Sequence, residues 1–547
     1  MKKQYKYLLF IFPVIYLLLG FYFRQVFGDL SLRSTDPEYI DFISGMCVAT
    51  GKFSQANIDH PGSIFQIILA VVFRIIYFFR GNRTPFFEDA IANSDLYLAV
   101  SNLVITTIVA SVMLWAGKAT FKITNNYLYA LLIQVEPLIL KVWYSIIGRI
   151  YPELILVIPV YLLQVQLLRE IFNKNDNPTK SLATYSFAVG IGLSIKMTFL
   201  PFIVLPLFVI KKLSRKIKYL LYSIAIFFLL SPQVAFQWHH FWNWMKGMFV
   251  HSGRYQGGDS NIIDVSLFLK NLGKILTDER YFFYAAAILI ILLLILIFTK
   301  RAKSPFSLIS MGLTLTFAGL VFIVSKQFAI RYFIPAILFF PFLLILNKEI
   351  IQVYFKQKAV KTGLSIILIF IIGYNINQTI PHARIVSKSI SKQMSARIQT
   401  RDFINTLPKN SYKIIVSQDY GCPFHEYAIM YSFAMGGKQW PNYREKLNKL
   451  YPDTYMYFTW DNTIKYWGKP YNPLNIANSD KPVYLYLQKN NDELYKRTID
   501  KLLENSKDIS IKKKLLFNNP VNHEGILQLY FSTNPIPVDD TIKKTAS

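Results

Sequence analysis

Long apolar segments, separated by short basic ones, dominate the first 380 residues of the chain. The stretch Ala285–Phe298 is one of them and contains no charged residue. An apolar helix of about 20 residues crosses a bilayer and pairs its backbone polar groups internally. The pattern predicts an α-helical polytopic membrane protein with about eleven spanning helices. These are Tyr7–Phe23, Ser94–Ala116, Tyr127–Ser145, Pro152–Arg169, Ser181–Lys196, Phe199–Ile210, Tyr219–Phe236, Tyr281–Thr299, Phe306–Val324, Tyr332–Leu346 and Gly363–Asn377.

One further apolar stretch, Ser63–Phe79, is predicted to lie along the membrane surface. If it does, the inner loops are Gly117–Lys122, Asn173–Lys180, Lys211–Lys218, Lys300–Lys303 and Lys348–Lys361, nearly all of them basic. Lys and Arg are retained on the cytoplasmic face, so this orientation satisfies the charge bias, whereas a twelfth span would reverse it. Arg74 inside the stretch also favours an interfacial helix. The basic start of the chain lacks a cleavage site before Arg24, which predicts a retained first helix.

The same assignment of inner and outer loops divides the chain into two predicted domains. Residues 1–380 form the membrane domain, with a first outer loop at 24–93, and residues 381–547 form an extracytoplasmic domain. The second domain mixes helical patterns at Ser391–Leu407 and Asp492–Asn505 with strand-like runs, so we expect an α/β fold. The strand-like runs are Tyr412–Ser417, Pro482–Gln488 and Ile526–Ser532. A break or tilt is expected around Lys196–Pro201.

Composition supports the membrane interpretation and excludes others. Hydrophobic residues make up 53% of the chain and charged residues 17%, against about 25% charged in soluble domains. The net charge of +28 does not indicate a nucleic-acid partner, because the excess lies largely in the short loops that set orientation. Cys47 and Cys422 lack metal-type spacing. They could pair on the outer side, although we favour two unpaired thiols.

The first outer loop carries the acids with the clearest catalytic potential. Asp36-Pro37-Glu38 follows the first helix closely enough for a carboxylate to face both bilayer and water. One interpretation is a solvated loop acid with Pro37 at the start of a helix. The other is a carboxylate that acts as a general base or metal ligand.

Two further polar positions adjoin predicted spans. Arg149 and Glu153 flank the short outer loop at Tyr151-Pro152 and act either as an interfacial anchor or as the lining of a cavity shared with Asp36. Lys196 follows a glycine-containing helix, where it either snorkels to the surface or binds a phosphate.

The outer loop Gln237–Arg280 contains Trp238, Trp242 and Trp244, which suit an interfacial helix and also stack on sugars. A glycine-rich stretch with His251 and Tyr255 predicts a loop that closes over substrate. No nucleotide phosphate loop is present, and the pair His239-His240 is weak evidence for a metal.

A short predicted outer loop contains Lys326 and Arg331, followed by Tyr332 and Pro335. Basic residues are normally depleted from outer loops, so we interpret these two as ligands of an anion such as a lipid phosphate.

With these motifs in order, roughly residues 5–380 resemble the GT-C glycosyltransferases, particularly the branch of protein mannosyltransferases and lipid A aminoarabinose transferase. The matching features are the acid of Asp36-Pro37-Glu38-Tyr39, His60-Pro61 before a surface helix, the pair Arg149 and Glu153, the glycine-containing helix ending in Lys196, and Arg331-Tyr332 before Pro335. At His60-Pro61-Gly62 the chain departs from the mannosyltransferase pattern, where a second proline is usual, which leaves sugar and acceptor open.

The resemblance implies an inverting hexosyl or pentosyl transferase that takes its sugar from a polyprenyl-phosphate donor. Asp36 would be the base for the acceptor hydroxyl, with Glu38 beside it, and Lys196, Lys326 and Arg331 would hold the leaving phosphate. We add His60, Arg149, Glu153, His251, Tyr255 and Tyr332 as substrate- or phosphate-binding residues. No cofactor is required. A divalent cation at Asp36 and Glu38 is the alternative to the metal-free catalysis that we prefer.

The partners expected are the lipid-linked donor, membrane lipid and an envelope acceptor, which can be a lipid, a glycan or a protein. The expected location is the plasma membrane of a bacterium, with the site on the outer face. Two rival functions stay open. A transporter would place charges near mid-membrane and often shows repeats, and a non-catalytic scaffold would bind the lipid carrier without chemistry.

Overall fold

The computed structural model describes residues 3–33, 35–81, 83–172, 177–252, 259–418, 421–435, 443–504, 506 and 508–533. Its contacts divide the chain into two compact units. We call Met1–Val26, Ser44–Gly81 and Leu96–Ser387 the helical unit. We call Phe27–Ile43, Asn82–Asp95 and Lys388–Ser547 the sheet unit. Two segments of the predicted loop 24–93 therefore group with the C-terminal residues, and the division near the C-terminal part falls at Ser387 rather than at residue 380.

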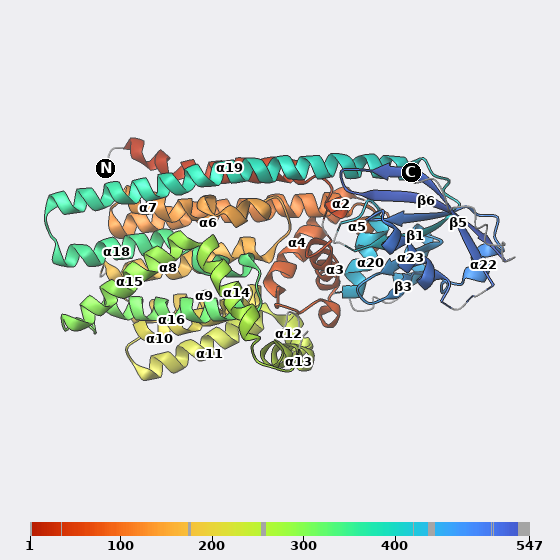
Figure 1. The fold of residues 1–547 in the computed structure, drawn as a ribbon. Coiled ribbons are helices and arrows are strands. Elements are labelled where there is room, and N and C mark those ends of the chain that lie inside the picture. Colours follow the sequence, from red (N-terminus) through yellow and green to blue (C-terminus); the bar gives the residue numbers. More distant parts are fainter. Residues whose placement is uncertain are drawn as a thin grey trace. The chain divides into compact units, whose positions relative to one another are not determined.

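Long apolar helices build the helical unit, and α8 runs beside α9 and α16 (Figure 1). Its helices, some of which extend beyond the unit, are α1 (Ile11–Phe27), α3 (Glu38–Ala49), α4 (Ser63–Arg80), α6 (Ser94–Thr124), α7 (Tyr127–Val135), α8 (Val157–Ile171), α9 (Pro178–Ile195), α10 (Val204–Val209), α11 (Leu213–Leu230), α12 (Pro232–Phe236), α13 (Trp238–Val250), α14 (Val265–Asp278), α15 (Arg280–Phe298), α16 (Pro305–Lys326), α17 (Ile334–Ile337), α18 (Phe340–Tyr354) and α19 (Lys358–Asn405). Short 3-10 helices link them at Lys3–Phe10, Phe53–Gln55, Glu136–Ile139, Lys141–Ser145, Pro152–Leu156, Met197–Ile203 and Ile330–Phe333.

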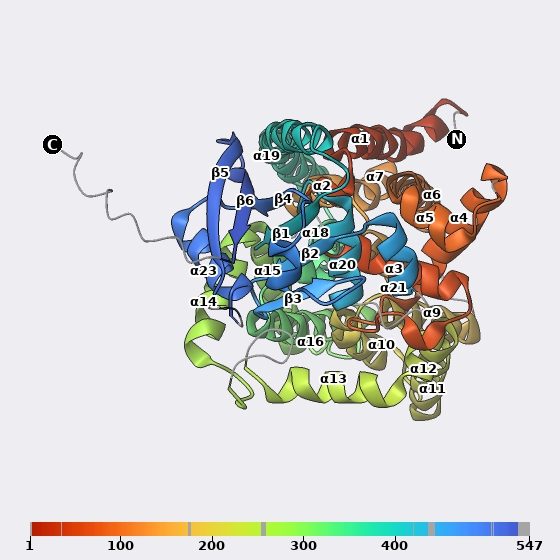
Figure 2. The same ribbon diagram turned by 90° about the vertical axis from the view of Figure 1, so that its right-hand side faces the viewer.

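Among the described residues, eight helices are long and apolar enough to cross a membrane. They include seven of the predicted spans and α4, and shorter apolar helices at Tyr127–Ile139 and Met197–Val209 match two more. The last two predicted spans coincide with α9 and α11. All the predicted spans are thus helical segments, and the number that crosses stays a prediction. Figure 2 looks nearly along α19, and in this view α13 is seen from the side. That α4 lies along the membrane surface stays a prediction.

The sheet unit contains a mixed sheet of six strands in the order β3-β2-β1-β4-β6-β5. Strand β1 pairs in parallel with β2 and β4, whereas β3, β6 and β5 join antiparallel. The strands are β1 (Tyr412–Ser417), β2 (Thr454–Phe458), β3 (Thr463–Tyr466), β4 (Val483–Leu487), β5 (Ser510–Asn519) and β6 (Glu524–Ser532). The helices are α2 (Leu30–Arg33), α5 (Phe86–Ala92), α20 (His425–Met435), α21 (Tyr443–Leu450), α22 (Pro473–Ala477) and α23 (Asp492–Leu502). The predicted α/β class is confirmed.

One predicted element needs correction. The pattern at Ser391–Leu407 is not a separate helix, because it continues the preceding apolar helix as the end of α19 (Lys358–Asn405). Nothing in this stretch stops the helix locally, and Pro381 lies inside it.

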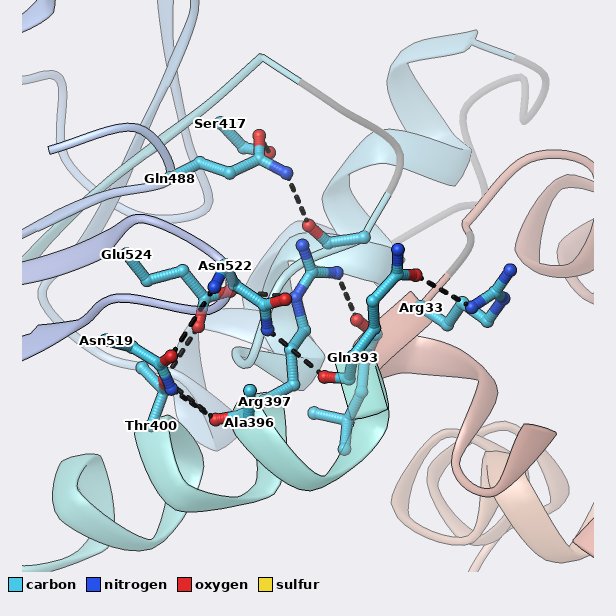
Figure 3. A network of polar contacts seen from close by, with 12 residues as sticks. Arg33, Gln393, Ala396, Arg397, Thr400, Ser417, Gln488, Asn519, Asn522 and Glu524 are labelled. Carbon is cyan, nitrogen blue, oxygen red and sulfur yellow. Dashed lines mark hydrogen bonds and ion pairs between the residues drawn. The ribbon is translucent and has the colours of Figure 1, made fainter. Parts of the chain in front are cut away.

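The end of α19 is bonded to the sheet through a buried carboxylate (Figure 3). Arg397 Nε lies 2.8 Å from Glu524 Oε1, and Thr400 Oγ1 donates to Glu524 Oε2 at 2.6 Å. Arg397 also donates to the backbone carbonyl of Leu32. The Arg397 side chain of α19 thus bonds both to Leu32, in the first-loop segment, and to Glu524 of β6. These bonds tie the first-loop segment to the sheet.

Candidate functional site

Four residues predicted as site residues meet in the helical unit around one buried carboxylate. The Glu153 side chain is 1% exposed, and the Lys196 ammonium group is bonded to its Oε1. Arg331 Nε lies 3.6 Å from the same oxygen, and the Lys196 nitrogen lies 4.3 Å from the centroid of the Tyr332 ring. A buried carboxylate with two cations is charge-compensated. A ring face beneath an ammonium group adds attraction of the cation–π kind.

Arg149 joins this group through Tyr151. Its guanidinium carbon lies 4.5 Å from the centroid of the Tyr151 ring, and that of Arg331 lies 5.4 Å from the same centroid. Asn102 fixes the loop by donating to the backbone carbonyl of Arg149 at 2.7 Å. Arg149, Lys196 and Arg331 thus bring three positive charges close to the buried carboxylate of Glu153. We call these four residues with Tyr151 and Tyr332 the cationic cluster.

Local breaks in the helices place these side chains. Helix α9 begins at Pro178, where Asn177 Oδ1 accepts from the backbone N–H groups of Thr179 and Lys180. It ends because Lys196 is extended (φ −160°, ψ 134°), and a 3-10 helix with Pro201 follows. The break expected around Lys196–Pro201 is therefore present. At Gly192 an added Cβ would lie 2.1 Å from the Phe199 ring, so the absence of a side chain allows the chain to turn at Lys196.

Glu153 and Arg331 also stand on short 3-10 helices. Pro152 opens the segment Pro152–Leu156, and its fixed φ suits a first helical position. Arg331 lies in Ile330–Phe333, and its side chain is 31% exposed, more than either partner in the ion pairs. The cluster is consequently closed on the Glu153 side and open to solvent or ligand on the Arg331 side.

His60 borders the cationic cluster with its ring. It stacks edge-on against Trp244 at 5.1 Å between centroids and lies 5.6 Å from Tyr332. Its backbone is left-handed (φ 66°), and the N–H of Gly62 donates to the carbonyl of Ile195 at 3.2 Å, which ties this loop to the end of α9. Burial, together with the charges of Lys196 and Arg331, holds the pKa of His60 well below its usual value. His60 is therefore a neutral imidazole at neutral pH.

Other predicted residues lie elsewhere or belong to the other unit. Lys326 ends α16 and donates to the carbonyl of Phe249 at 2.8 Å, and His251 directly follows α13. Tyr255 lies outside the described residues. Asp36 and Glu38 belong to the sheet unit, so their convergence with the cationic cluster stays a prediction.

Within the sheet unit, a buried polar chain holds the segment that carries both acids. Glu38 is fully buried in the first turn of α3, and Asp36 is half-buried. Tyr39 Oη lies 3.0 Å from Ser94 Oγ, which lies 2.6 Å from His425 Nε2. Burial lowers the pKa of His425, so the imidazole here is neutral too.

Two participants were not predicted as site residues. Tyr151 was interpreted as a membrane anchor, and Trp244 as part of an interfacial helix. The sequence spacing in α13 could have separated these tryptophans. Trp238 and Trp242 stand four residues apart on one face of the helix and are 46% and 57% exposed, whereas Trp244 stands on another face and is 5% exposed. The two free cysteines, Cys47 and Cys422, are both buried, in line with unpaired thiols.

The fold and the cluster define the chain as a polytopic helical membrane protein with a buried, positively charged site. No family model and no curated protein matches its sequence. Among solved structures it is similar to ArnT from Cupriavidus metallidurans bound to undecaprenyl phosphate, with a TM-score of 0.48 and 11% identity over 94% of this chain and 97% of that chain.

Proposed function

We propose that this protein is a glycosyltransferase that moves a sugar from a polyprenyl-phosphate donor to an envelope acceptor on the outer face of the membrane. The observation that carries the proposal is the cationic cluster, in which Arg149, Lys196 and Arg331 gather around the Glu153 carboxylate and the rings of Tyr151 and Tyr332. Three cations gathered at the ends of apolar helices suit a phosphate at headgroup level. A donor of this kind needs no nucleotide-binding fold.

The chemistry follows from the charges. In the transfer, the oxygen of the acceptor hydroxyl bonds to the anomeric carbon while the bond from that carbon to the phosphate oxygen breaks. The acceptor's proton passes to the Asp36 carboxylate, and the electron pair leaves with the polyprenyl phosphate, so the configuration at the anomeric carbon inverts. Lys196 and Arg331 stabilise the charge that develops on the departing phosphate. Glu153 holds Lys196 in place and cancels part of the ground-state charge.

His60 and Tyr332 have a separate role in this proposal. A neutral imidazole beside two aromatic rings adds no charge to the site and offers a polar edge to a sugar hydroxyl. We propose that these rings orient the donor sugar, whereas the cations bind its phosphate.

The decisive experiment replaces the proposed base. Asp36→Asn keeps the shape of the side chain but removes the carboxylate, and we expect transfer from a polyprenyl-phosphate sugar to fall by about 100-fold or more. Binding of the polyprenyl phosphate should persist. Glu88→Gln is the matched control, because Glu88 is an acid of the same predicted loop and pairs with Lys446 at 3.3 Å.

Three results would contradict the proposal in whole or in part. Unchanged transfer in Asp36→Asn would remove Asp36 from the mechanism. A wild-type protein that binds the carrier and transfers no sugar to any envelope fraction would be a scaffold, and carrier-independent uptake of a solute into vesicles would identify a transporter. Mass spectrometry of envelope glycans and glycolipids from a deletion strain identifies the sugar and the acceptor.

A further inference from the structure

A second positively charged site lies in the helical unit, away from the cationic cluster. A cavity of about 980 Å³ opens between α6, α8 and α9. Its walls include Trp115, Lys118 and Lys122 from α6, Gln166 and Arg169 from α8, and Lys180 from α9. The described residues that line it include four cations and no acid, and Gln166 in its wall donates to Glu170 Oε1 at 3.3 Å. Charges that only set orientation need to stand on one face, whereas these converge on a hollow.

The position of the cavity along α9 distinguishes it from the cationic cluster. Lys180 lies in the first turn of α9, and Lys196 follows its last residue. A helix of 18 residues is about 27 Å long, close to the roughly 30 Å of the hydrocarbon core. The cavity and the cluster therefore lie at opposite headgroup levels. The charge pattern predicts the cavity side, with the loops Gly117–Lys122 and Asn173–Lys180, to be cytoplasmic.

Hydrogen bonds hold the side chains at the floor of the cavity, whereas the exposed side chains at its rim can change conformation. Gln166 is 1% exposed, donates to Ser181 Oγ at 2.9 Å and accepts from Arg169 Nη1 at 3.2 Å, so Arg169 is held toward the interior. Lys118, Lys122 and Lys180 are exposed and can turn toward a bound anion. Fixed and flexible cations together suit a phosphate group that enters from the side.

Apolar surface continues from the cavity on both sides of α9. Leu114 and Ile123 line the cavity itself. A groove of about 490 Å³ on the other side of α9 is lined by Phe187, Tyr222 and Ile226 and shares Lys180 with the cavity. A molecule with a phosphate and long acyl chains uses both surfaces, whereas a soluble phosphate uses only the first.

We propose that this cavity binds the phosphate headgroup of an anionic membrane phospholipid from the cytoplasmic leaflet, with an acyl chain in the apolar groove beside α9. The site is separate from the donor site and does not depend on the proposed transferase activity. Each Lys or Arg near such a surface attracts an anionic lipid by about 1 kcal/mol, so four cations support a defined site.

The test uses the full chain in detergent with phosphatidylglycerol and phosphatidylcholine as probes, and native mass spectrometry as the readout. We expect wild-type protein to retain one phosphatidylglycerol in preference to phosphatidylcholine. The triple variant Lys118→Gln, Lys122→Gln, Lys180→Gln should bind phosphatidylglycerol at least about ten-fold more weakly. Replacing the same three residues by Arg should preserve binding, which shows that charge and not loss of folding is responsible.

The matched control removes equal charge from the same predicted face. Lys211, Lys212 and Lys218 are exposed and do not line the cavity, and their triple replacement by Gln should leave binding within about two-fold of wild type. Equal loss in both Gln triples would overturn the proposal in favour of diffuse surface charge. Retention of the phosphatidylglycerol in the cavity triple would overturn it as well, because the lipid would then be bound elsewhere, for example at Lys196. Displacement of the lipid by excess inorganic phosphate would show a soluble-anion site instead.

Discussion

The ammonium nitrogen of Lys196 lies 4.3 Å from the centroid of the Tyr332 ring, while the same group is bonded to Glu153. The three residues come from three different segments of the chain and are all largely buried. The Lys196 ammonium group is therefore held by the charge of Glu153 and by the face of the Tyr332 ring. Its side chain has little conformational freedom when a ligand binds. Several expectations about stability and charge state depend on this arrangement and on the buried ion pair between Glu524 and Arg397 in the sheet unit.

Breaking the ion pair between Lys196 and Glu153 should destabilise the protein strongly. Lys196→Met leaves the Glu153 carboxylate with less compensation in a buried place, and we expect a loss of about 3–5 kcal/mol in the free energy of unfolding. The double variant Lys196→Met, Glu153→Leu should be more stable than Lys196→Met alone, because the fully buried carboxylate is gone and the Arg331 side chain, which is 31% exposed, keeps access to water. Denaturant unfolding in detergent measures the wild type, Lys196→Met, Glu153→Leu and the double variant. Strictly additive effects would show that the two residues are not coupled.

His60 should make stability depend on pH in the acid range. The folded-state pKa lies well below the usual 6.5, so the unfolded chain takes up a proton that the folded protein does not. The contribution of His60 to the free energy of unfolding is complete above pH 6.5. It is lost as the pH falls, by about 1.4 kcal/mol per pH unit, until the pKa of His60 in the folded protein is reached.

His60→Asn should flatten this dependence, since Asn tolerates the left-handed backbone and does not titrate. Thermal unfolding from pH 5 to pH 8 on the wild type, His60→Asn and the exposed control His239→Asn measures the effect. A wild type and a His60→Asn variant with the same slope would exclude His60 as its source.

In the sheet unit, Glu524 should carry more stability than an exposed acid. Its carboxylate is fully buried, binds Arg397 and Thr400 (Figure 3) and accepts from Tyr486 at 3.0 Å. Glu524→Ala strands the Arg397 guanidinium and should cost about 3–5 kcal/mol. Glu504→Ala is the control, because Glu504 is 54% exposed and pairs with Lys501, and it should change stability by less than about 1 kcal/mol. Similar losses in both variants would refute this difference.

The eleven-span topology places the first loop outside. Arg83 is exposed, and Arg83→Cys should react with an impermeant thiol reagent added to intact cells. The two natural cysteines are buried, so they give little background. Labelling that requires lysis would show that α4 crosses the membrane and would overturn the orientation of every later loop.

Metal removal tests the alternative at Asp36 and Glu38. For metal-free catalysis, transfer should be unchanged after treatment with EDTA. Loss of activity that Mg²⁺ or Mn²⁺ restores would favour a divalent cation held by carboxylate oxygens. Asp36→Asn and Glu38→Gln would then both weaken the response to added metal.

Sequence pattern was sufficient for elements whose signal is local. The apolar runs became helices, and β1 was predicted with its bounds, Tyr412–Ser417, because its β-branched run Ile414-Ile415-Val416 favours a buried strand locally. Strand β5 was missed. Its run Lys512-Lys513-Lys514 resembles a solvated loop, yet β5 pairs only with β6 at the edge of the sheet, where lysines are tolerated.

By itself, the sequence determined that this chain is a helical membrane protein with an α/β domain, and it selected Arg149, Glu153, Lys196 and Arg331 by charges that are costly near apolar spans. Only the tertiary structure decided that these four residues gather around Tyr151 and Tyr332 while Lys326 binds the carbonyl of Phe249. The reason is physical. Hydropathy depends on neighbouring residues, whereas the partner of a buried charge depends on how helix ends far apart in the sequence pack together.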